Sequence, residues 1–413
     1  MGGRSPRAAL SATDQDPQDQ GMKMHIHLPE DIVQLRDTVR RFVDTEVEPR
    51  AAEIDRTNAI PTPIFDTARE LGLFGLSIPE EFGGLGECEL ASCVALETLS
   101  RGPGGVTFYV APNAPAAAIR HAGTPKQKAD YLEPLAEGRK FAAFCLTEEG
   151  AGSDAAGIRT RAVKRGDTWV INGTKMWVSR AADAEVFLVS AVTDPERKPK
   201  PGITIFLIGR RPGLSTGAPD VQMGGRGSGS AEVRFEDVEA GEDEILGELH
   251  DGFGGLKFVL GRARLWAAAR AVGVIGKAAE LSIDHSRTRR QFGQPIGEFQ
   301  MVKEKIANMV ADLYAARLQL YQAASLFDQG IDAAQEAAYA KLFASEAAGR
   351  ATDACVQIHG AMGVAVGFAA ERLYRDCRSY RILDGTSDIQ RLMIASRVQK
   401  RGLGESIAPG GVA

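Results

Sequence analysis

The sequence predicts a mostly helical protein with a β-rich segment in the middle of the chain. Apolar residues recur every three or four positions from about residue 29 to 140, which indicates helices. They alternate every two positions over 141–248, and the helical spacing returns from 249 onward. We therefore expect an N-terminal helical domain (29–140), a middle β-barrel or β-sandwich domain (141–248) and a C-terminal four-helix bundle (249–402).

In the first domain, one apolar stripe opens the helical pattern, and it consists of Ile32, Leu35, Val39 and Phe42. Pro63 is suited to the first turn of the next helix, and the glycines of 83–86 break the chain. In the middle domain, Trp169 and Ile171 alternate with polar residues and Asn172-Gly173 follows. This pair predicts a hairpin turn, because both turn positions favour positive φ.

The bundle is predicted from an apolar seam that steps by three and four, made of Phe299, Val302, Ile306, Met309, Leu313, Ala316 and Leu320. Gly330 ends this helix, and a second long helix over 333–358 ends at Gly360. A last helix begins near Thr386–Asp388 and ends at Gly402, after a basic final turn. We expect residues 1–28 to form a disordered tail and 403–413 a flexible one.

Composition excludes several classes of protein. The chain has 413 residues, 44% of them hydrophobic and 25% charged, which is ordinary for a globular enzyme. The net charge of -5 does not favour nucleic acid as a partner. No apolar run reaches ~18 residues, so no membrane span is expected; the stretch 265–275 is short and is interrupted by Arg270. The six histidines lack ligand spacing, so we expect no metal. Five scattered cysteines and the absence of a secretory signal indicate a cytoplasmic protein.

A glycine-rich loop, Gly150–Ala155, loosely fits the dinucleotide pattern GxGxxA. No long helix follows it, so a Rossmann site is disfavoured. Two alternatives stay open. The loop is either a surface turn or a backbone that faces a cofactor or thioester, with Ser153 as a polar contact.

Several motifs in order resemble those of the acyl-CoA dehydrogenase family, across about residues 29–402. They are PEEFGGLG (79–86), TEEGAGSD (147–154), WVS (177–179), RRQFG (289–293), QIHGAMG (357–363) and LDGTSDIQR (383–391). The resemblance implies the three-domain fold above, FAD as cofactor and an acyl-CoA substrate. It also implies a homotetramer that passes electrons to an electron-transferring flavoprotein.

The resemblance also implies roles for residues around the flavin. Leu146 and Thr147 would contact the ring near N5 and O4, Trp177 would form its aromatic wall, and Ser179 would add a polar contact. From the neighbouring subunit, Arg289 would meet the pyrophosphate, because a guanidinium is a fixed, delocalised cation. The nucleotide half would be framed by Phe292, Gln300, Gln357 and Gly360. Thr386 and Asp388 would contact the adenosine or ribityl part, although capping of the last helix also explains them. Core packing remains an alternative for Trp177, and a solvated helix end for Arg289.

The catalytic base implied by the resemblance is Asp384, with Gly385, Arg264 and Ser153 near the thioester. Most members carry glutamate at this position, and aspartate reaches ~1–1.5 Å less, a misplacement that can slow a reaction markedly. Some members place a glutamate on the first bundle helix instead, but the matching residue here is Ala263, which cannot ionise.

We therefore expect an active base adapted to an unusual acyl group, such as a branched or alicyclic one. The alternatives are a substrate carried on a carrier protein, and a flavin-binding subunit of altered or no dehydrogenase activity.

Overall fold

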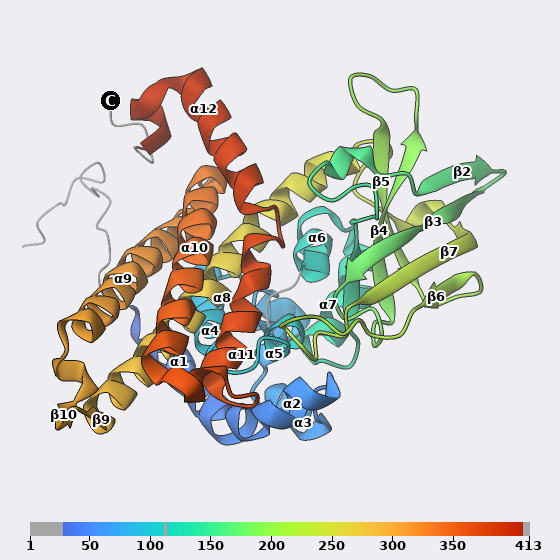
Figure 1. Ribbon diagram of the computed structural model, residues 1–413. Helices are drawn as coiled ribbons and strands as arrows, with labels where there is room; N and C mark the ends of the chain where they lie inside the picture. Colours follow the sequence, from blue (N-terminus) through green and yellow to red (C-terminus); the bar gives the residue numbers. More distant parts are fainter. Residues whose placement is uncertain (1–27, 111–113, 408–413) are drawn as a thin grey trace, which may run out of the picture.

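The computed structural model describes residues 28–110 and 114–407. Figure 1 shows a helical body with a β-sheet domain at one side. The predicted fold class is confirmed: helices come first, the sheet domain follows, and a helical domain closes the chain. The predicted N-terminal tail lies almost entirely outside the described residues.

The N-terminal domain is built from short helices that enclose their own apolar core. Its α-helices are α1 (Glu30–Phe42), α2 (Ala51–Thr57), α3 (Thr62–Glu70), α4 (Glu89–Leu99), α5 (Val106–Tyr109), α6 (Ala114–Ala122) and α7 (Pro125–Ala136). Tighter or wider helical turns occur at Val43–Val47, Glu48–Arg50, Leu73–Gly75 and Glu80–Phe82. The predicted stripe on α1 buries Ile32, Val39 and Phe42.

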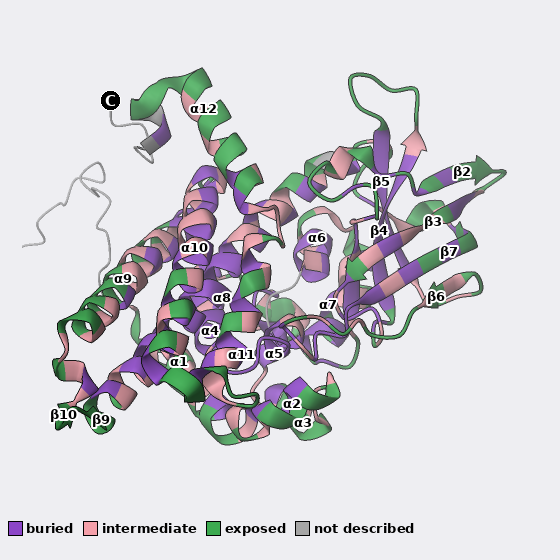
Figure 2. Ribbon diagram, viewed as in Figure 1, coloured by how far each residue is buried: buried purple, intermediate pink, exposed green. Residues whose placement is uncertain are grey.

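The middle domain is one large sheet in the described chain, with strand order β6-β7-β3-β2-β4-β5-β8 and with β1 pairing parallel to β4. The strands are β1 (Ala142–Cys145), β2 (Arg161–Arg165), β3 (Thr168–Val178), β4 (Val186–Asp194), β5 (Gly202–Gly209), β6 (Leu214–Thr216), β7 (Ala231–Ala240) and β8 (Ile245–Leu246). Figure 2 shows β4 and β5 buried along their length and β2 largely exposed. One face of β4 and β5 packs with α6, α7 and the helix α8 (Gly252–Thr288), and the other packs against the remaining strands.

The hairpin predicted at Asn172-Gly173 was wrong. Strand β3 continues through both residues, and the turn that joins β2 to β3 lies at Gly166-Asp167. The Asn172 side chain instead bonds Asp237 on β7, donating to Oδ1 (3.0 Å) and accepting from the backbone N–H (2.9 Å). The register with β7 shifts at Gly173, where a Cβ would come within 2.4 Å of Thr160 Oγ1. The Asn-Gly pair therefore forms a β-bulge instead of a turn. Glycine is required at position 173 because the Thr160 side chain lies too close for a Cβ.

The C-terminal domain is a helical bundle. Its elements are α8, the two-residue strands β9 (Arg290–Gln291) and β10 (Gln294–Pro295), α9 (Gln300–Asp328), α10 (Ala334–His359), α11 (Ala369–Arg378) and α12 (Ser387–Ile407). Short 3₁₀ turns occur at Ile296–Glu298, Gly360–Val364 and Ser379–Arg381. The predicted stops at Gly330 and Gly360 are present, and both glycines have positive φ.

The end of the last helix differs from the prediction. We expected the bundle to end at Gly402 and a flexible tail from 403. Gly402 does break the helix, with φ of 79°, but a short helical segment continues to Ile407. The Ser406 carbonyl accepts hydrogen bonds from Gln335 Nε2 and Tyr339 Oη on α10, so this segment docks onto the bundle.

Helices α8 and α4 approach most closely at Gly273. A Cβ built there would lie 2.0 Å from the carbonyl oxygen of Glu97 on α4. One turn later, a Cβ at Gly276 would first meet the Arg101 side chain at 3.5 Å, which is ordinary contact. The interface between the two helical domains therefore requires glycine at 273 but not at 276.

We predict that Gly273→Ala destabilises the protein by about 1–3 kcal/mol, because an added methyl group would push the two helices apart. Gly276→Ala is the matched control on the same helix. It should be neutral or stabilising by up to about 1 kcal/mol, since alanine favours helix over glycine. Urea unfolding of both variants measures the difference, and equal free energies of unfolding would contradict the close approach.

Candidate active site

The loop between α11 and α12 turns sharply at Asp384 and Gly385. Their φ angles are 55° and 91°, so both lie in the left-handed region. Glycine adopts this region freely, and aspartate tolerates it better than most side chains because its short polar group bonds locally. The loop thus places a carboxylate at a corner of the chain, just before the start of α12.

Two side chains hold this corner through the same carbonyl group. Lys341 Nζ on α10 donates to Gly385 O at 2.7 Å, and Gln390 Nε2 on α12 donates to the same oxygen at 2.8 Å. Both side chains are buried. The backbone N–H of Asp384 has no acceptor among the described residues.

Three cations lie near enough to the Asp384 carboxylate to act on it electrostatically: Arg270, Lys341 and Arg264. Burial raises the pKa of Asp384 above its ordinary value, and the three cations act in the opposite direction. Burial lowers the pKa of Lys341 to about 8, although Asp384 opposes this shift. The structure therefore brings together three of the predicted residues, Asp384, Gly385 and Arg264, while the nearby Ala263 is buried and offers no second carboxylate.

Sequence reasoning missed Lys341, Gln390 and Arg270. A signal for two of them existed. Arg270 interrupts an apolar run, and Lys341 falls on the inward face of an alanine-rich helix. Burying a charged side chain costs much free energy unless it has a polar partner. A lone cation at a core position of the sequence therefore indicates an anion or a carbonyl group nearby.

The predicted flavin loop follows β1, leads to β2 and lies beside the end of β3. Thr147 O accepts a hydrogen bond from Met176 N at 2.9 Å, which sets Trp177 close to Leu146 and Thr147. Trp177 has φ of 59° and is 58% exposed, so core packing does not explain this residue. An aromatic ring is presented to the outside next to a strand edge. Ser179 follows on the same segment and is partly buried, and Ser153 is exposed on the glycine-rich loop.

A buried ion pair braces this loop, and sequence reasoning did not predict it. Lys175 Nζ lies 2.8 Å from Glu148 Oε1 and donates to Leu146 O at 3.1 Å. Glu148 also accepts from the backbone N–H groups of Arg159 (2.6 Å) and Thr160 (2.9 Å). Burial opposes the charge of Glu148, but Lys175 and these donors outweigh it and lower the pKa of Glu148.

The predicted nucleotide-binding residues gather at the far end of the bundle. Arg289 follows α8 directly, and Gln357 lies in the last turn of α10. The two helix ends meet through the stacked rings of His285 and His359, whose centroids are 4.4 Å apart. All five predicted residues there are exposed: Arg289, Phe292, Gln300, Gln357 and Gly360. In Figure 1, β9 and β10 mark this end at the lower left, while the sheet lies at the right. Within one chain, this group does not meet Trp177.

The start of α12 shows helix capping at one of its two predicted residues. Thr386 Oγ1 accepts from Ile389 N at 3.2 Å, which caps the helix. Asp388 is exposed and pairs with Arg391 at 3.0 Å. Cofactor contact by Thr386 and Asp388 stays a prediction.

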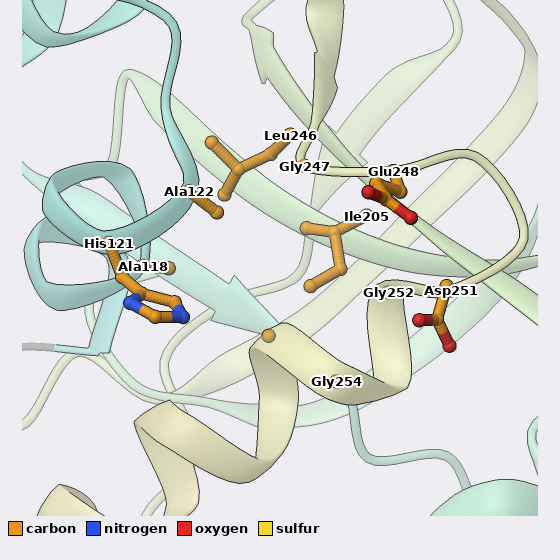
Figure 3. Close-up of a pocket in the computed structure, with 11 residues that line it drawn as sticks. Ala118, His121, Ala122, Ile205, Leu246, Gly247, Glu248, Asp251, Gly252 and Gly254 are labelled. Carbon is orange, nitrogen blue, oxygen red and sulfur yellow. The ribbon is translucent and has the colours of Figure 1, made fainter.

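A separate pocket of about 240 Å³ lies between α6 and the start of α8 (Figure 3). It is lined by Ala118, His121, Ala122, Ile205, Leu246, Gly247, Glu248, Asp251, Gly252, Gly254 and Gly255. The His121 ring stacks on Phe258 with centroids 3.7 Å apart, and burial lowers its pKa, with Arg262 and Arg120 acting in the same direction. None of the predicted site residues lines this pocket, so we do not assign the chemistry to it.

Two structural findings bear on other kinds of site. Over residues 28–110 and 114–407, no three His, Cys, Asp or Glu side chains are grouped as metal ligands. In the same part of the chain, every helix is too short or too polar to cross a bilayer.

Family models match all three parts of the chain. The N-terminal, middle and C-terminal domains of acyl-CoA dehydrogenase match residues 29–139, 143–238 and 250–399, respectively. The chain belongs to the acyl-CoA dehydrogenase family. It is accordingly an FAD-dependent oxidoreductase that acts on acyl-CoA.

Three similar proteins illustrate the relationship. A probable acyl-CoA dehydrogenase of Bacillus subtilis is 38% identical over 380 residues, which cover 91% of this chain and all of that protein. The butyryl-CoA dehydrogenase structure from Megasphaera elsdenii has a TM-score of 0.87 at 32% identity, covering 91% of this chain and 99% of that one. The prolyl acyl carrier protein oxidase AnaB has a TM-score of 0.86 at 31% identity, covering 90% and 100%.

The residues of this acyl-CoA dehydrogenase fit the flavin. An exposed indole beside a strand edge matches a wide planar ring that needs an apolar wall and hydrogen bonds along one edge. Gly150 and Gly152 have open space where a Cβ would stand, so their backbone is accessible. Arg289 and Gln357 are exposed, so their guanidinium and amide groups are available and would suit a pyrophosphate and a nucleotide.

We predict that Lys175→Met lowers the free energy of unfolding by ~3–5 kcal/mol, because Glu148 would remain buried without its partner cation. FAD occupancy should also fall, since the Leu146–Glu148 segment loses its support. Urea unfolding and the flavin absorbance of the purified protein are the measurements.

Lys164→Met is the matched control, because Lys164 pairs with Glu242 at the surface of the same domain. This variant should change stability by less than ~1 kcal/mol. Similar losses in the two lysine variants would show that the buried pair adds nothing to the flavin loop.

Proposed function

We propose that the enzyme oxidises an acyl-CoA to the 2,3-enoyl-CoA with Asp384 as the base that removes the α-proton. The single observation behind this assignment is the corner at Asp384. The carboxylate is held in a left-handed turn, it faces three cations, and Ala263 leaves no carboxylate at the family's alternative position. Asp384 is half-buried, and a carboxylate whose pKa is raised by partial removal from water is a better base than one in water.

The residues around Asp384 suit α-proton removal. An α-C–H bond becomes acidic only if the thioester oxygen is stabilised as negative charge develops on it. The backbone N–H of Asp384, which lacks an acceptor in the described chain, would donate to that oxygen. Arg264 adds positive charge nearby, and Lys341 keeps the Gly385 peptide oriented. When bound, FAD accepts the β-hydrogen as hydride.

The second half of the cofactor site would come from another subunit. Thr147 and Trp177 lie in the sheet domain, whereas Arg289 and Gln300 lie at the other end of the bundle (Figure 1). This separation supports a homo-oligomer, and the family resemblance suggests a homotetramer that passes electrons to an electron-transferring flavoprotein. FAD would then bridge two chains.

A carrier-protein thioester is the second candidate substrate. The similarity to the prolyl acyl carrier protein oxidase favours it, because a phosphopantetheine arm occurs in both CoA and carrier proteins. Incubating the enzyme with one acyl group on CoA and on a carrier protein decides between them. A branched or alicyclic acyl group stays a hypothesis about either substrate.

We predict that Asp384→Asn retains FAD and acyl-CoA binding but loses α-proton abstraction by ~10²-fold or more, because the amide cannot accept the proton. Anaerobic flavin reduction by stopped flow and exchange of the α-hydrogen in deuterated water measure this step. In the wild type, exchange should slow as the pH falls through the pKa of Asp384, since a protonated carboxyl group is no base. The variant should lack this acid limb.

Asp384→Glu is the companion variant, because it restores the usual side chain of the family at this position. If the pocket is built around aspartate, the added methylene group should slow reduction by the native substrate. Near-wild-type exchange in Asp384→Asn would show that another group is the base. A subunit without dehydrogenase activity would bind FAD but show no flavin reduction with any thioester.

We predict that Arg289→Ala lowers FAD occupancy and weakens the oligomer together, because FAD that binds only the assembled protein stabilises the assembly. Size-exclusion chromatography at several protein concentrations, with and without added FAD, measures both effects. Arg287→Ala, an exposed arginine in the last turn of α8, is the control and should change neither property. Full FAD affinity of Arg289→Ala at nanomolar protein would contradict the contribution from a second chain.

A further inference from the structure

Arg270 is a buried cation whose hydrogen-bond acceptors in the described chain are all neutral. It lies in the middle of α8 and is 6% exposed. Its Nε donates to Thr107 Oγ1 (3.1 Å), one terminal nitrogen donates to Thr107 O (3.2 Å), and the guanidinium lies 4.7 Å from the Phe108 ring centroid. The other terminal nitrogen, Nη1, has no acceptor among the described residues.

The position of Arg270 relates it to the proposed reaction centre. It follows Ala263 by seven residues, which places both on one face of α8, two turns or about 10 Å apart. The 3₁₀ turn Ser379–Arg381, which leads into the Asp384 loop, packs against α8 and buries Tyr380 in the same core. Asp384 and Tyr380 are the acidic groups with which Arg270 interacts. Arg270 therefore faces the base loop from inside the bundle.

Positive charge exceeds negative charge around this loop. Arg264, Arg270 and Lys341 all face Asp384, and Arg180, also buried, donates to the backbone carbonyls of Phe108 and Tyr109 beside Arg270. None of these four cations forms an ion pair with a described residue. Asp384 acts at longer range on Arg264, Arg270 and Lys341, and Glu346 acts on Lys341 as well.

Two further polar atoms in this region have no partner. Tyr380 Oη and Arg264 Nε are buried without a hydrogen bond among the described residues. Buried polar atoms and buried charges are costly when they are left unsatisfied. A bound group that carries negative charge and acceptor oxygens would balance the buried positive charge and accept the missing hydrogen bonds.

We propose that Arg270 binds a carboxylate at the far end of the acyl group, so that the enzyme prefers ω-carboxyacyl thioesters. A carboxylate supplies the missing negative charge and can accept from the unused N–H groups of the guanidinium. This inference rests on the proposed function, because it takes Asp384 to mark the reacting end of the acyl group. It adds the chemical class of the substrate.

The first experiment uses the wild-type FAD-loaded enzyme and three matched CoA thioesters. Their acyl groups, of four to six carbons, end in a carboxylate, in a carboxamide or in a hydroxymethyl group. We expect kcat/KM for flavin reduction to be about 10- to 100-fold higher for the carboxylate, the range typical of a hydrogen bond to a charged group. Equal rates, or a preference for either neutral group, would overturn the proposal.

The second experiment tests the residue. Arg270→Met should lower kcat/KM for the carboxylate substrate about 10- to 100-fold more than for the two neutral ones, since the loss of a cation near Asp384 affects all three substrates equally. Arg270→Lys should retain part of the preference. Arg210→Met is the matched control, because Arg210 in the sheet domain also donates only to neutral acceptors, here backbone carbonyls, and lies over an aromatic ring. It should leave the preference unchanged. If Arg270→Met slows all three substrates alike, Arg270 serves Asp384 or the fold and does not recognise the substrate.

Calorimetry separates a failure of this proposal from a failure of the proposed function. If no thioester reduces the flavin, the proposed reaction is wrong, and the relative Kd values of the three thioesters still decide whether the site prefers an anion. If Arg270→Met does not fold, the wild-type panel and Arg270→Lys decide the question. The proposal is supported in either case by tighter binding of the carboxylate thioester that is lost in Arg270→Met and reduced in Arg270→Lys.

Discussion

The fixed position of one carboxylate among buried cations is the constraint on which the candidate site depends. Asp384 lies in a loop that no regular hydrogen-bond ladder supports, so other elements must hold it. Lys341 on α10 and Gln390 on α12 bind the next carbonyl group, while Arg264 and Arg270 on α8 supply opposing charge. Three helices from distant parts of the sequence therefore position one side chain, and the packing of the bundle becomes a condition for the chemistry.

In the sheet domain, a buried ion pair holds the predicted flavin loop in place. The loop at Thr147 lies beside the exposed Trp177. Lys175 binds Leu146 O and Glu148 of this loop through buried hydrogen bonds. Arg289 and its neighbours lie at the opposite end of the bundle from this loop. If both groups hold FAD as proposed, one chain supplies half of each site and a second chain would complete it.

Much of the fold could be predicted from the sequence, because hydrophobic periodicity reports which face of an element is buried. The long helices of the bundle and their glycine stops at Gly330 and Gly360 show this directly. Hydrophobic periodicity does not show which residues a buried polar side chain contacts. Lys175, Lys341 and Arg270 occupy core positions whose acceptors lie in remote segments, so their roles emerged only from the packed structure. The Asn172-Gly173 error has a related cause, since β7 pairs with β3 and turns a hairpin signal into a bulge. The motif residues near Asp384 and Trp177 were found through family resemblance, which encodes remote contacts that local rules miss.

The two proposals give a common explanation for an aspartate at the position of the base and an arginine inside an apolar helix. Aspartate suits the left-handed corner but reaches ~1 Å less far than glutamate, so proton transfer then depends on how deeply the acyl group enters. Apolar contacts alone do not fix how deeply the acyl group enters the site, because they are not directional. A substrate held at its far end by the buried Arg270 would be fixed in depth by a charge-assisted hydrogen bond. The cation would then supply the positional control that a shorter base requires, and the two residues would act as a unit.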